Sequence, residues 1–351
     1  MSRITLADLA AAAGVSMSTV DRLMNGRFPV RGDTAEMILA TAERIGFYGA
    51  ATIRSRLRTR STDLTLGVVL HQSYRPFYAN LGRAIEEAAA NHPHSTVRAR
   101  VTYAEDLSPE AIAANMLKLG QKADVISVVA AQHPQISRAI ETLSANGVPT
   151  IALISEHADK GVAGFVGTDS VMLGRTAAWA LDRICQKPGK IGIILGSHRY
   201  RCHEQNEIGF RSYLREHRPD LVLAEPVTNF EDREIAERTT LALLEREPNL
   251  SAILMCGGAV SGVVAALRQV RPPFSLPAVA NEMSDDRRHD LSDGYLTLVF
   301  ATPLRLMAER LIAAALYVAT KMPAADAPEG AFFRQSFSER IPFDLFTSEN
   351  I

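Results

Sequence analysis

Two short helical patterns with a glycine between them occupy the first 26 residues of this 351-residue chain. The first pattern ends at Ala13, and Gly14 follows where the chain must leave helical geometry, because glycine adopts φ > 0 without steric cost. Ser16 suits the N-cap of the second helix, since its hydroxyl can accept a hydrogen bond from a first-turn N–H. Both helices contribute to one apolar seam, made of Leu6, Leu9, Ala10, Ala13, Val15, Val20, Leu23 and Met24. The pattern predicts a helix-turn-helix, whose second helix enters the major groove of DNA.

A third helix is predicted after this pair, capped by Asp33-Thr34 and ending at Ile45. Its apolar stripe consists of Met37, Ile38, Ala42 and Ile45. Two amphipathic helices joined by a glycine turn also occur in domains that do not bind DNA, so both interpretations of the pair stay open at this point. The residues left outward on the second helix are Met17, Ser18, Asp21 and Arg22.

Positive charge is concentrated in the same part of the chain. Arg54, Arg56, Arg58 and Arg60 occupy every second position, so a strand would point them to one side and a helix would spread them. Residues 1–62 hold nine arginines, no lysine and five acidic residues, which gives +4; the whole chain carries −1, so residues 63–351 carry −5. A basic head on a near-neutral chain favours contact with phosphate groups.

This N-terminal segment resembles the lactose/galactose-repressor family of bacterial transcription regulators. The resemblance rests on Thr5-Leu6-x-Asp8-Leu9-Ala10-x-x-Ala13-Gly14-Val15-Ser16-x-x-Thr19-Val20-x-Arg22-x-x-Asn25-Gly26, then Val30, Thr34 and Ile45-Gly46-Phe47. It implies that Met17, Ser18 and Arg22 face base edges, and that the DNA backbone is contacted by Ser16, Thr19, Asn25, Arg54, Arg56 and Arg58. It also implies a homodimer on a pseudo-palindromic, double-stranded DNA operator, because two heads related by a two-fold axis read two half-sites.

Two departures from the family pattern concern DNA contact. Asp21 stands where the family usually has serine, and its carboxylate would repel phosphates unless an arginine such as Arg22 pairs with it. The family's hinge helix usually reads Ala-x-x-Leu, with the leucine wedged into the minor groove. The corresponding stretch here is Arg54-Ser55-Arg56-Leu57, so Leu57 is predicted as the wedge, with Ile53 as the alternative.

From Leu64 onward, short apolar runs alternate with longer helical patterns. Predicted strands are 66–71, 96–103, 125–130, 150–154, 165–166, 190–195, 222–226, 252–256, 278–280 and 296–300. Predicted helices are 79–91, 109–120, 134–146, 171–185, 206–217, 233–246, 260–268, 285–291 and 303–319. Such alternation is typical of parallel, doubly wound sheets. The predicted fold class is an N-terminal all-α helix-turn-helix head plus an α/β body.

The body resembles periplasmic sugar-binding proteins through Pro76-Phe77-Tyr78 with Ile85-Glu86, Gly167-Thr168-Asp169-Ser170 with Gly174 and Ala178, and Gly209-Phe210. The resemblance implies two Rossmann-like lobes (periplasmic binding protein type I-like), with crossings between them near 166–170, near 300 and near 322–332. The expected domains are a DNA-binding domain at 1–48, a hinge at 49–63 and an effector-binding and dimerisation domain at 64–351. Within the last, lobe N spans about 64–166 and 301–325, and lobe C about 170–299 and 330–351.

Ligands of such folds bind at the carboxyl ends of strands, in the crevice between lobes. On this basis the effector site is predicted at Gln72, Phe77, Tyr78, His133, Ser155, Asp169, His198, Asn206 and Glu282. Phe77 also fits a structural role in packing its lobe. Many relatives place arginine at the position of Asn206 and a polar residue where this chain has Phe300-Ala301-Thr302, so contacts to a polyol are weakened or relocated. A sugar or sugar derivative is the expected effector.

Signals for catalysis or metal binding are missing from the sequence. It shows no nucleophile–base–orienter set, and the segment from His198 to His203 does not match a zinc knuckle and is predicted as a loop beside the cleft. Three cysteines far apart are typical of reduced thiols. We expect no enzymatic activity, cofactor or metal, and a cytoplasmic protein without membrane contact. The alternative, a solute-binding protein for sugar uptake, would share the body but have no use for a helix-turn-helix.

Overall fold

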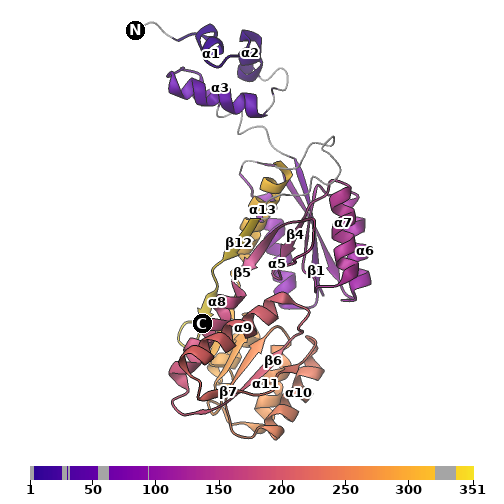
Figure 1. Cartoon of the computed structure of the whole chain (residues 1–351), viewed down its shortest axis with the longest axis vertical. Helices are drawn as coiled ribbons and strands as arrows, with labels where there is room; N and C mark the ends of the chain where they lie inside the picture. The colour runs from indigo at the N-terminus through magenta and orange to yellow at the C-terminus, as the bar shows by residue number, and fades with distance from the viewer. Residues whose placement is uncertain (1–3, 26–29, 31, 54–62, 94, 321–336) are drawn as a thin grey trace. The chain divides into compact units, whose positions relative to one another are not determined.

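The computed structural model describes the chain except for residues 1–3, 26–29, 31, 54–62, 94 and 321–336 (Figure 1). The chain divides into two compact units, residues 1–63 with 91–97 and residues 64–90 with 98–351. The first unit contains the head, defined here as residues 4–53, and the second unit is the body.

The described helices of the head include α1 (Leu6–Ala12), α2 (Met17–Asn25) and α3 (Gly32–Arg44), and residues 50–53 are helical as well. α1 begins at a capping box, in which Thr5 and Asp8 exchange hydrogen bonds between side chain and backbone. Gly14 has φ 65°, the left-handed conformation predicted for the turn. The Ser16 hydroxyl accepts the N–H of Thr19 at 3.2 Å, as predicted for an N-cap. These contacts build the predicted helix-turn-helix.

The predicted apolar seam forms the core of the head, where Leu9, Val20 and Ile38 are completely buried. The expected place of Met37 in this core is wrong, because its side chain is 44% exposed. Leu39 packs against the core from the same helix instead. The start of α3 at Gly32, ahead of the predicted Asp33-Thr34 cap, is a boundary shift of the usual size.

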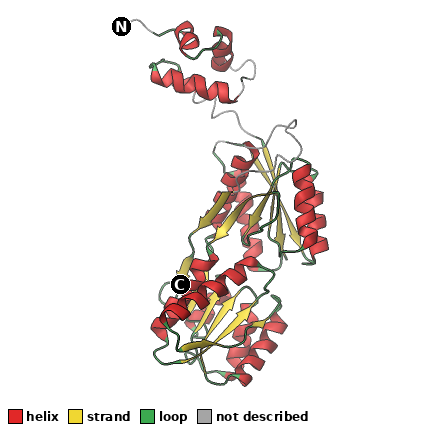
Figure 2. Cartoon of the chain, in the orientation of Figure 1, coloured by secondary structure: helices red, strands yellow, loops and turns green. Residues whose placement is uncertain are grey.

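The first lobe of the body is a six-stranded sheet in the order β12-β5-β4-β3-β1-β2. Helices flank the sheet on both sides (Figure 2). Its strands are β1 (Leu64–His71), β2 (Val97–Ala104), β3 (Val125–Val128), β4 (Thr150–Leu153), β5 (Val162–Thr168) and β12 (Phe337–Ile341). Its helices are α5 (Pro76–Ala90), α6 (Pro109–Gly120), α7 (Pro134–Ala145) and α13 (Leu304–Thr320). α5 packs with α13 and α6 packs with α7, on opposite faces of the sheet (Figure 1). With both faces covered, β3 is buried along its whole length.

The second lobe is a seven-stranded sheet in the order β13-β11-β10-β9-β6-β7, with β8 paired to β6. Its strands are β6 (Gly189–Leu195), β7 (Leu221–Leu223), β8 (Val227–Thr228), β9 (Leu250–Cys256), β10 (Ala278–Asn281), β11 (Leu298–Ala301) and β13 (Asp344–Phe346). Its helices are α8 (Ser170–Ile184), α9 (Arg201–His217), α10 (Arg233–Arg246), α11 (Val260–Val270) and α12 (Asp285–Ser292). Ile193 and Leu195 of β6 face the core under α8 and α9, whereas Ile194 faces the core under α10 and α11.

Two glycines let α8 and α9 pack with their backbones in contact. A β-carbon on Gly174 would lie 2.0 Å from the backbone oxygen of Asn206. One on Gly209 would lie 2.1 Å from the backbone oxygen of Val171. Because backbone atoms cannot rotate away, only glycine allows this approach. The contact fixes the position of Asn206, which lies on the first turns of α9.

The chain crosses between the lobes after β5, after β11 and between β12 and β13. The last crossing corrects the expectation that 330–351 belong to the second lobe. β12 pairs in parallel with β5 of the first lobe, and only β13 pairs with β11, in antiparallel fashion. The reason is that β12 is a half-exposed edge strand with a weak apolar pattern, which gave no strand signal in the sequence.

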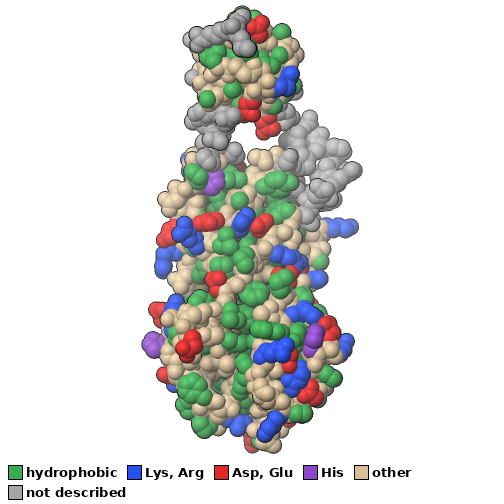
Figure 3. Space-filling view, turned by 90° about the vertical axis from the view of Figure 1, so that its left-hand side faces the viewer, with side chains coloured by type: hydrophobic (Ala, Val, Ile, Leu, Met, Phe, Trp, Pro, Cys, Tyr) green, Lys and Arg blue, Asp and Glu red, His purple; other side chains and the backbone are tan. Residues whose placement is uncertain are grey.

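The surface of the body carries both signs of charge. Figure 3 shows one face, on which Lys/Arg and Asp/Glu side chains are interspersed around hydrophobic side chains gathered in its middle. This mixture agrees with a net charge of −1 for the whole chain. Within the described residues, no helix combines the length and apolarity that a membrane crossing requires.

Candidate functional site

α2 exposes the three residues predicted to face DNA bases. Met17 is 60% exposed, and Ser18 and Arg22 are also exposed. The Arg22 Nε donates to the Ser18 backbone oxygen at 3.1 Å, and its Nη2 donates to the Ser18 hydroxyl at 3.3 Å. The Ser16 hydroxyl lies 2.9 Å from that of Ser18 and 2.8 Å from that of Thr19. The polar groups of this face are therefore held together in one row.

Asp21 pairs with an amide instead of an arginine. The Asn25 Nδ2 donates to Asp21 Oδ1 at 2.6 Å. Arg22 does not pair with Asp21, because Arg22 reaches back to Ser18, whereas Asn25 lies four residues ahead of Asp21 on the same helix face. The amide is neutral, so the negative charge of Asp21 remains on α2.

The predicted hinge contacts Arg54, Arg56, Leu57 and Arg58 lie outside the described residues. Ile53, the alternative wedge, is completely buried in the core of the head. A side chain in this position stabilises the head and cannot enter a DNA groove without leaving that core. Leu57 stays the predicted wedge.

A cavity of about 80 Å³ lies between the two lobes of the body. It is lined by Phe77, Tyr78, Val129, Ile154, Thr168, Ser170, Leu173, Tyr200, Cys202, His203, Asn206, Glu231, Gly257, Asn281, Glu282, Phe300 and Thr302. A groove of about 950 Å³, also between the lobes, shares Phe77, Glu231 and Glu282 with the cavity. Ligands of open α/β sheets bind at this place, outside the carboxyl ends of strands.

Five of the nine predicted effector residues lie at these openings. Phe77, Tyr78, Asn206 and Glu282 line the cavity. Gln72 lines the groove, together with Phe77 and Glu282. Asn206 reaches the cavity because α9 begins at Arg201, so the segment predicted as a loop is partly helical.

Two predicted effector residues cap helices instead of lining the cavity. The His133 Nδ1 accepts the N–H of Gln135 at the start of α7. The Asp169 carboxylate accepts the N–H of Met172 at 2.9 Å at the start of α8, and lies 3.4 Å from Arg340. An acidic or polar N-cap turns its side chain onto its own helix. This explains why Asp169 is not among the lining residues although its neighbours on both sides are.

Ser155 and His198 also lie outside the lining. Ser155 is buried, and the residue before it, Ile154, has φ 67°. This left-handed turn presents Ile154 to the cavity in place of Ser155. His198 is exposed in the loop before α9, whereas Tyr200 from the same loop lines the cavity.

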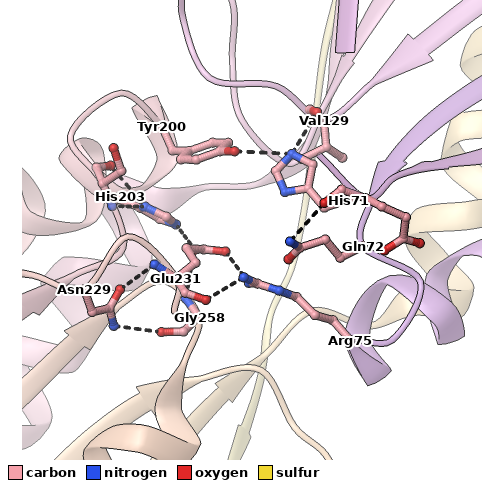
Figure 4. A network of polar contacts seen from close by, with 11 residues as sticks. His71, Gln72, Arg75, Val129, Tyr200, His203, Asn229, Glu231 and Gly258 are labelled. Carbon is pink, nitrogen blue, oxygen red and sulfur yellow. Dashed lines mark hydrogen bonds and ion pairs between the residues drawn. The ribbon is translucent and has the colours of Figure 1, made fainter. Parts of the chain in front are cut away.

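An ion pair between Arg75 and Glu231 joins the two lobes (Figure 4). The Arg75 Nη1 lies 2.7 Å from Glu231 Oε2, and its Nη2 donates to the backbone oxygen of Glu231. The other carboxylate oxygen of Glu231, Oε1, accepts the N–H of Gly258 at 3.0 Å and lies 3.4 Å from His203 Nε2. Burial alone would raise the pKa of Glu231, but the charges of His203 and Arg75 outweigh burial and lower it. Both carboxylate oxygens of Glu231 thus have partners, and two cations offset its negative charge.

His203 is the second cation of this cluster. Burial favours its neutral ring, but the neighbouring Cys202 sulfur and the Glu231 carboxylate outweigh burial and raise the pKa of His203 to about 9. As an imidazolium it donates from both ring nitrogens, toward the Ser197 backbone oxygen at 3.2 Å and toward Glu231.

His71 lies across the cleft as a neutral ring. Burial lowers the pKa of His71 to about 4, so the ring is neutral at pH 7. Its Nε2 lies 3.0 Å from the Val129 backbone oxygen and 3.3 Å from the Tyr200 hydroxyl of the other lobe (Figure 4). Because a carbonyl can only accept, Nε2 carries the proton. The Tyr200 hydroxyl oxygen therefore accepts from this same N–H.

Glu282 is the carboxylate of the cavity that no cation matches. Burial, and then repulsion by Glu231, raises the pKa of Glu282 to about 7, against the attraction of Arg75, His203 and Arg287. Its side chain forms no hydrogen bond or ion pair with another described residue. At neutral pH it therefore exists in both protonation states.

Backbone strain gathers at the same openings. Ile154, Phe230, Glu231, Ala259 and Glu282 have φ between 50° and 68°, and all five line the cavity or the groove. Such conformations cost about 1–3 kcal/mol each in residues other than glycine. They are typical of ligand sites, where surrounding structure holds a side chain in a fixed direction.

Sequence reasoning missed Arg75, His203 and Glu231. Arg75 directly precedes the Pro76-Phe77-Tyr78 motif, so the motif was a usable signal for it. His203 became available only once α9 was known to begin at Arg201. Glu231 follows the two-residue strand β8, which no periodic pattern marks.

Residues 66–321 match the family described as "Periplasmic binding protein domain". The chain belongs to this family. Residues 5–49 match "Bacterial regulatory proteins, lacI family". This periplasmic-binding-protein chain thus carries a lacI-type head. Both resemblances inferred from the sequence are confirmed, as is the fold class of a helical head and a two-lobed α/β body.

Two relatives are regulators by name. Catabolite control protein A of Priestia megaterium is 35% identical over 94 residues, 27% of this chain and 28% of the relative. An uncharacterized HTH-type transcriptional regulator in the aml 5′ region of Streptomyces limosus is 27% identical over 212 residues, 60% of this chain and 58% of the relative. The matched region spans less than two thirds of either relative.

The body also resembles solved structures in its fold. A solute-binding protein from Agrobacterium vitis, bound with α-D-tagatopyranose, superposes with a TM-score of 0.71 at 17% identity. The superposition covers 82% of this chain and 95% of that one. At this identity the likeness shows the fold alone.

Proposed function

We propose that this chain is a sequence-specific DNA-binding transcriptional regulator whose operator affinity is controlled by a small molecule bound between the lobes. One observation carries the proposal: a single chain joins a lacI-type helix-turn-helix to a two-lobed binding domain with a cavity between its lobes. The uptake alternative accounts for the body only, because transport has no use for the exposed recognition face of α2.

On the DNA side, Met17, Ser18 and Arg22 read bases from α2. Their exposure and the row of hydrogen bonds along this face support that role. Ser16, Thr19 and Asn25 contact the DNA backbone, together with Arg54, Arg56 and Arg58 of the linker. Leu57 enters the minor groove.

On the effector side, a sugar or sugar derivative binds between the lobes. Support comes from the mixture of aromatic and polar side chains in the lining, and from the fold that the body shares with a tagatose-bound protein. Phe77 and Tyr78 offer ring faces, and Asn206 and Glu282 offer polar contacts to hydroxyl groups. The site binds its ligand without chemical conversion.

The regulator acts in the cytoplasm as a homodimer on a pseudo-palindromic operator. Two heads are required because one helix-turn-helix reads one half-site. α5 and α12 are the proposed contact surfaces between the two bodies. Movement of the lobes changes the spacing of the heads, so effector and operator affect each other's affinity equally.

The test begins with selection of DNA from a random pool by the full-length protein. We expect one enriched, pseudo-palindromic sequence. Arg22→Ala should weaken binding to it by about 1–3 kcal/mol with little change on random DNA, because a base contact discriminates and a phosphate contact does not. If no sequence is enriched, the proposal is rejected. If Arg22→Ala loses equal affinity for the operator and for random DNA, Arg22 does not read bases.

A further inference from the structure

The groove between the lobes is strongly acidic. Among the described residues that line it, eight are acidic and three are arginines, which gives a formal charge of −5. Two of the acids, Glu231 and Glu282, are shared with the cavity; the others are Glu105, Asp106, Asp232, Glu234, Glu237 and Asp286. A cleft lined by one sign of charge concentrates ligands of the opposite sign and repels those of the same sign.

Two carboxylates lie at the inner end of the groove, and among the described residues only one of them forms ion pairs. Arg75 and His203 both pair with Glu231. Glu282 has no partner within ion-pair distance among the described residues, and its raised pKa shows that the site does not fully stabilise its negative charge. Glu282 therefore offers a free counter-charge to whatever enters the cavity.

The rest of the lining suits hydrogen-bond donors. The side-chain oxygens of Asn206 and Asn281 are buried and accept no hydrogen bond from the described residues. Asn206 is only 3% exposed as a whole, so its amide is built into the cavity wall. Phe77, Tyr78 and Tyr200 add aromatic rings, whose faces attract cations.

The charged groups around the cavity allow a monocation to bind without a change in local charge. With Glu282 protonated, Arg75, His203 and Glu231 sum to +1. A bound monocation that displaces the proton of Glu282 leaves this sum unchanged, because one positive charge replaces another. An anionic ligand would instead have to pass a groove that still carries a formal charge of −4 when Glu282 is protonated, from seven ionised acids and three arginines.

We propose that the effector carries a protonated amine that pairs with Glu282 between the lobes, as in an amino sugar or an amino polyol. This inference rests on the proposed function and narrows its effector from carbohydrates in general to hydroxylated organic cations.

The test is a thermal-shift titration of the full-length protein with matched ligands at about 10 mM, since a ligand that binds only the folded state raises its melting temperature. Glucosamine and galactosamine are compared with glucose and galactose, and glucose 6-phosphate serves as the anionic probe. We expect an amino sugar to raise the melting temperature more than its neutral parent, and the phosphate to have no effect.

Two further readouts locate the amine. The affinity for the amino sugar should rise roughly fivefold from pH 6 to pH 7, because Glu282 becomes increasingly ionised in this range while the amine keeps most of its proton, His71 stays neutral and His203 stays charged. Glu282→Gln should remove both the preference for the amine and its pH dependence. Glu309→Gln, which removes an exposed acid on α13, is the matched control and should change neither.

Three results would overturn the inference: a neutral sugar or the phosphate binding as well as the amino sugar, an unchanged preference in Glu282→Gln, or no shift with either amino sugar. Operator binding separates this failure from failure of the proposed function. If a neutral sugar changes operator affinity, the function stands and only the amine is rejected. If no operator is selected from random DNA, the function falls whatever the amino sugars do.

Discussion

The Arg75 Nη1 and the Glu231 Oε2 lie 2.7 Å apart, 156 residues apart in the chain and on opposite sides of the cleft. Their side chains are 18% and 8% exposed, so solvent screens this pair less than it screens ion pairs at the surface. The pair is a direct electrostatic link between the lobes at the mouth of the cavity.

Breaking this link should destabilise the body. Arg75→Met leaves Glu231 buried with one cation fewer, and we expect a loss of about 2–3 kcal/mol in the free energy of unfolding. A double-mutant cycle with Glu231→Gln, measured by urea denaturation, should give a coupling of about 1–3 kcal/mol. The exposed pair Arg305–Glu309 is the control, with an expected coupling below about 0.5 kcal/mol. Equal coupling in both cycles would contradict the link.

Glu282 should make stability depend on pH. The pKa of Glu282 is raised from 4.5 to about 7, so between these values the folded protein holds a proton that the unfolded chain has lost. Its contribution to stability therefore falls as pH rises from about 4.5 through 7. The free energy of unfolding of Glu282→Gln minus that of wild type should therefore be higher at pH 8 than at pH 5, by roughly 2 kcal/mol. Denaturation of both proteins at the two pH values checks this, and a pH-independent difference would count against it.

Gly174 should not tolerate a side chain. A methyl group there meets the backbone oxygen of Asn206 at 2.0 Å, so Gly174→Ala must push α8 and α9 apart. We expect a loss of about 1–3 kcal/mol and weaker effector binding, because the same shift moves Asn206. Thr176→Ala on the same helix is the control and should stay within about 0.5 kcal/mol of wild type. Unchanged stability in Gly174→Ala would show that the helices separate without cost.

Asp169 should act as a helix cap and not as a ligand contact. Asp169→Ala removes the acceptor for the Met172 N–H and should cost about 1 kcal/mol, whereas Asp169→Asn keeps a capping oxygen and should cost less. Both variants should retain the melting-temperature shift produced by the effector. Loss of that shift in the Asn variant at wild-type stability would return Asp169 to the binding site.

The sequence predicts an element correctly where the interactions that define the element join residues close together in the chain. α6 and α10 occupy the residues predicted for them, because capping residues and apolar periodicity within a dozen residues define a helix. β12 was missed because its pairing with β5 joins residues about 170 positions apart. The candidate site follows the same rule. Phe77 and Tyr78 were predicted because they belong to a local motif, whereas Glu231, the partner of Arg75, lies far from it in the chain.

Local patterns in the sequence determined the helix-turn-helix head, the alternation of strands and helices, and the strand ends near which a ligand binds. They suffice because a turn glycine, an N-cap and an apolar stripe act over a few residues. The tertiary structure alone decided that Asp169 turns onto its own helix, that Glu231 receives two cations and that Glu282 receives none. Those outcomes depend on how two separately folded lobes bring distant charges together in a buried space, where the loss of water makes each unmatched charge costly.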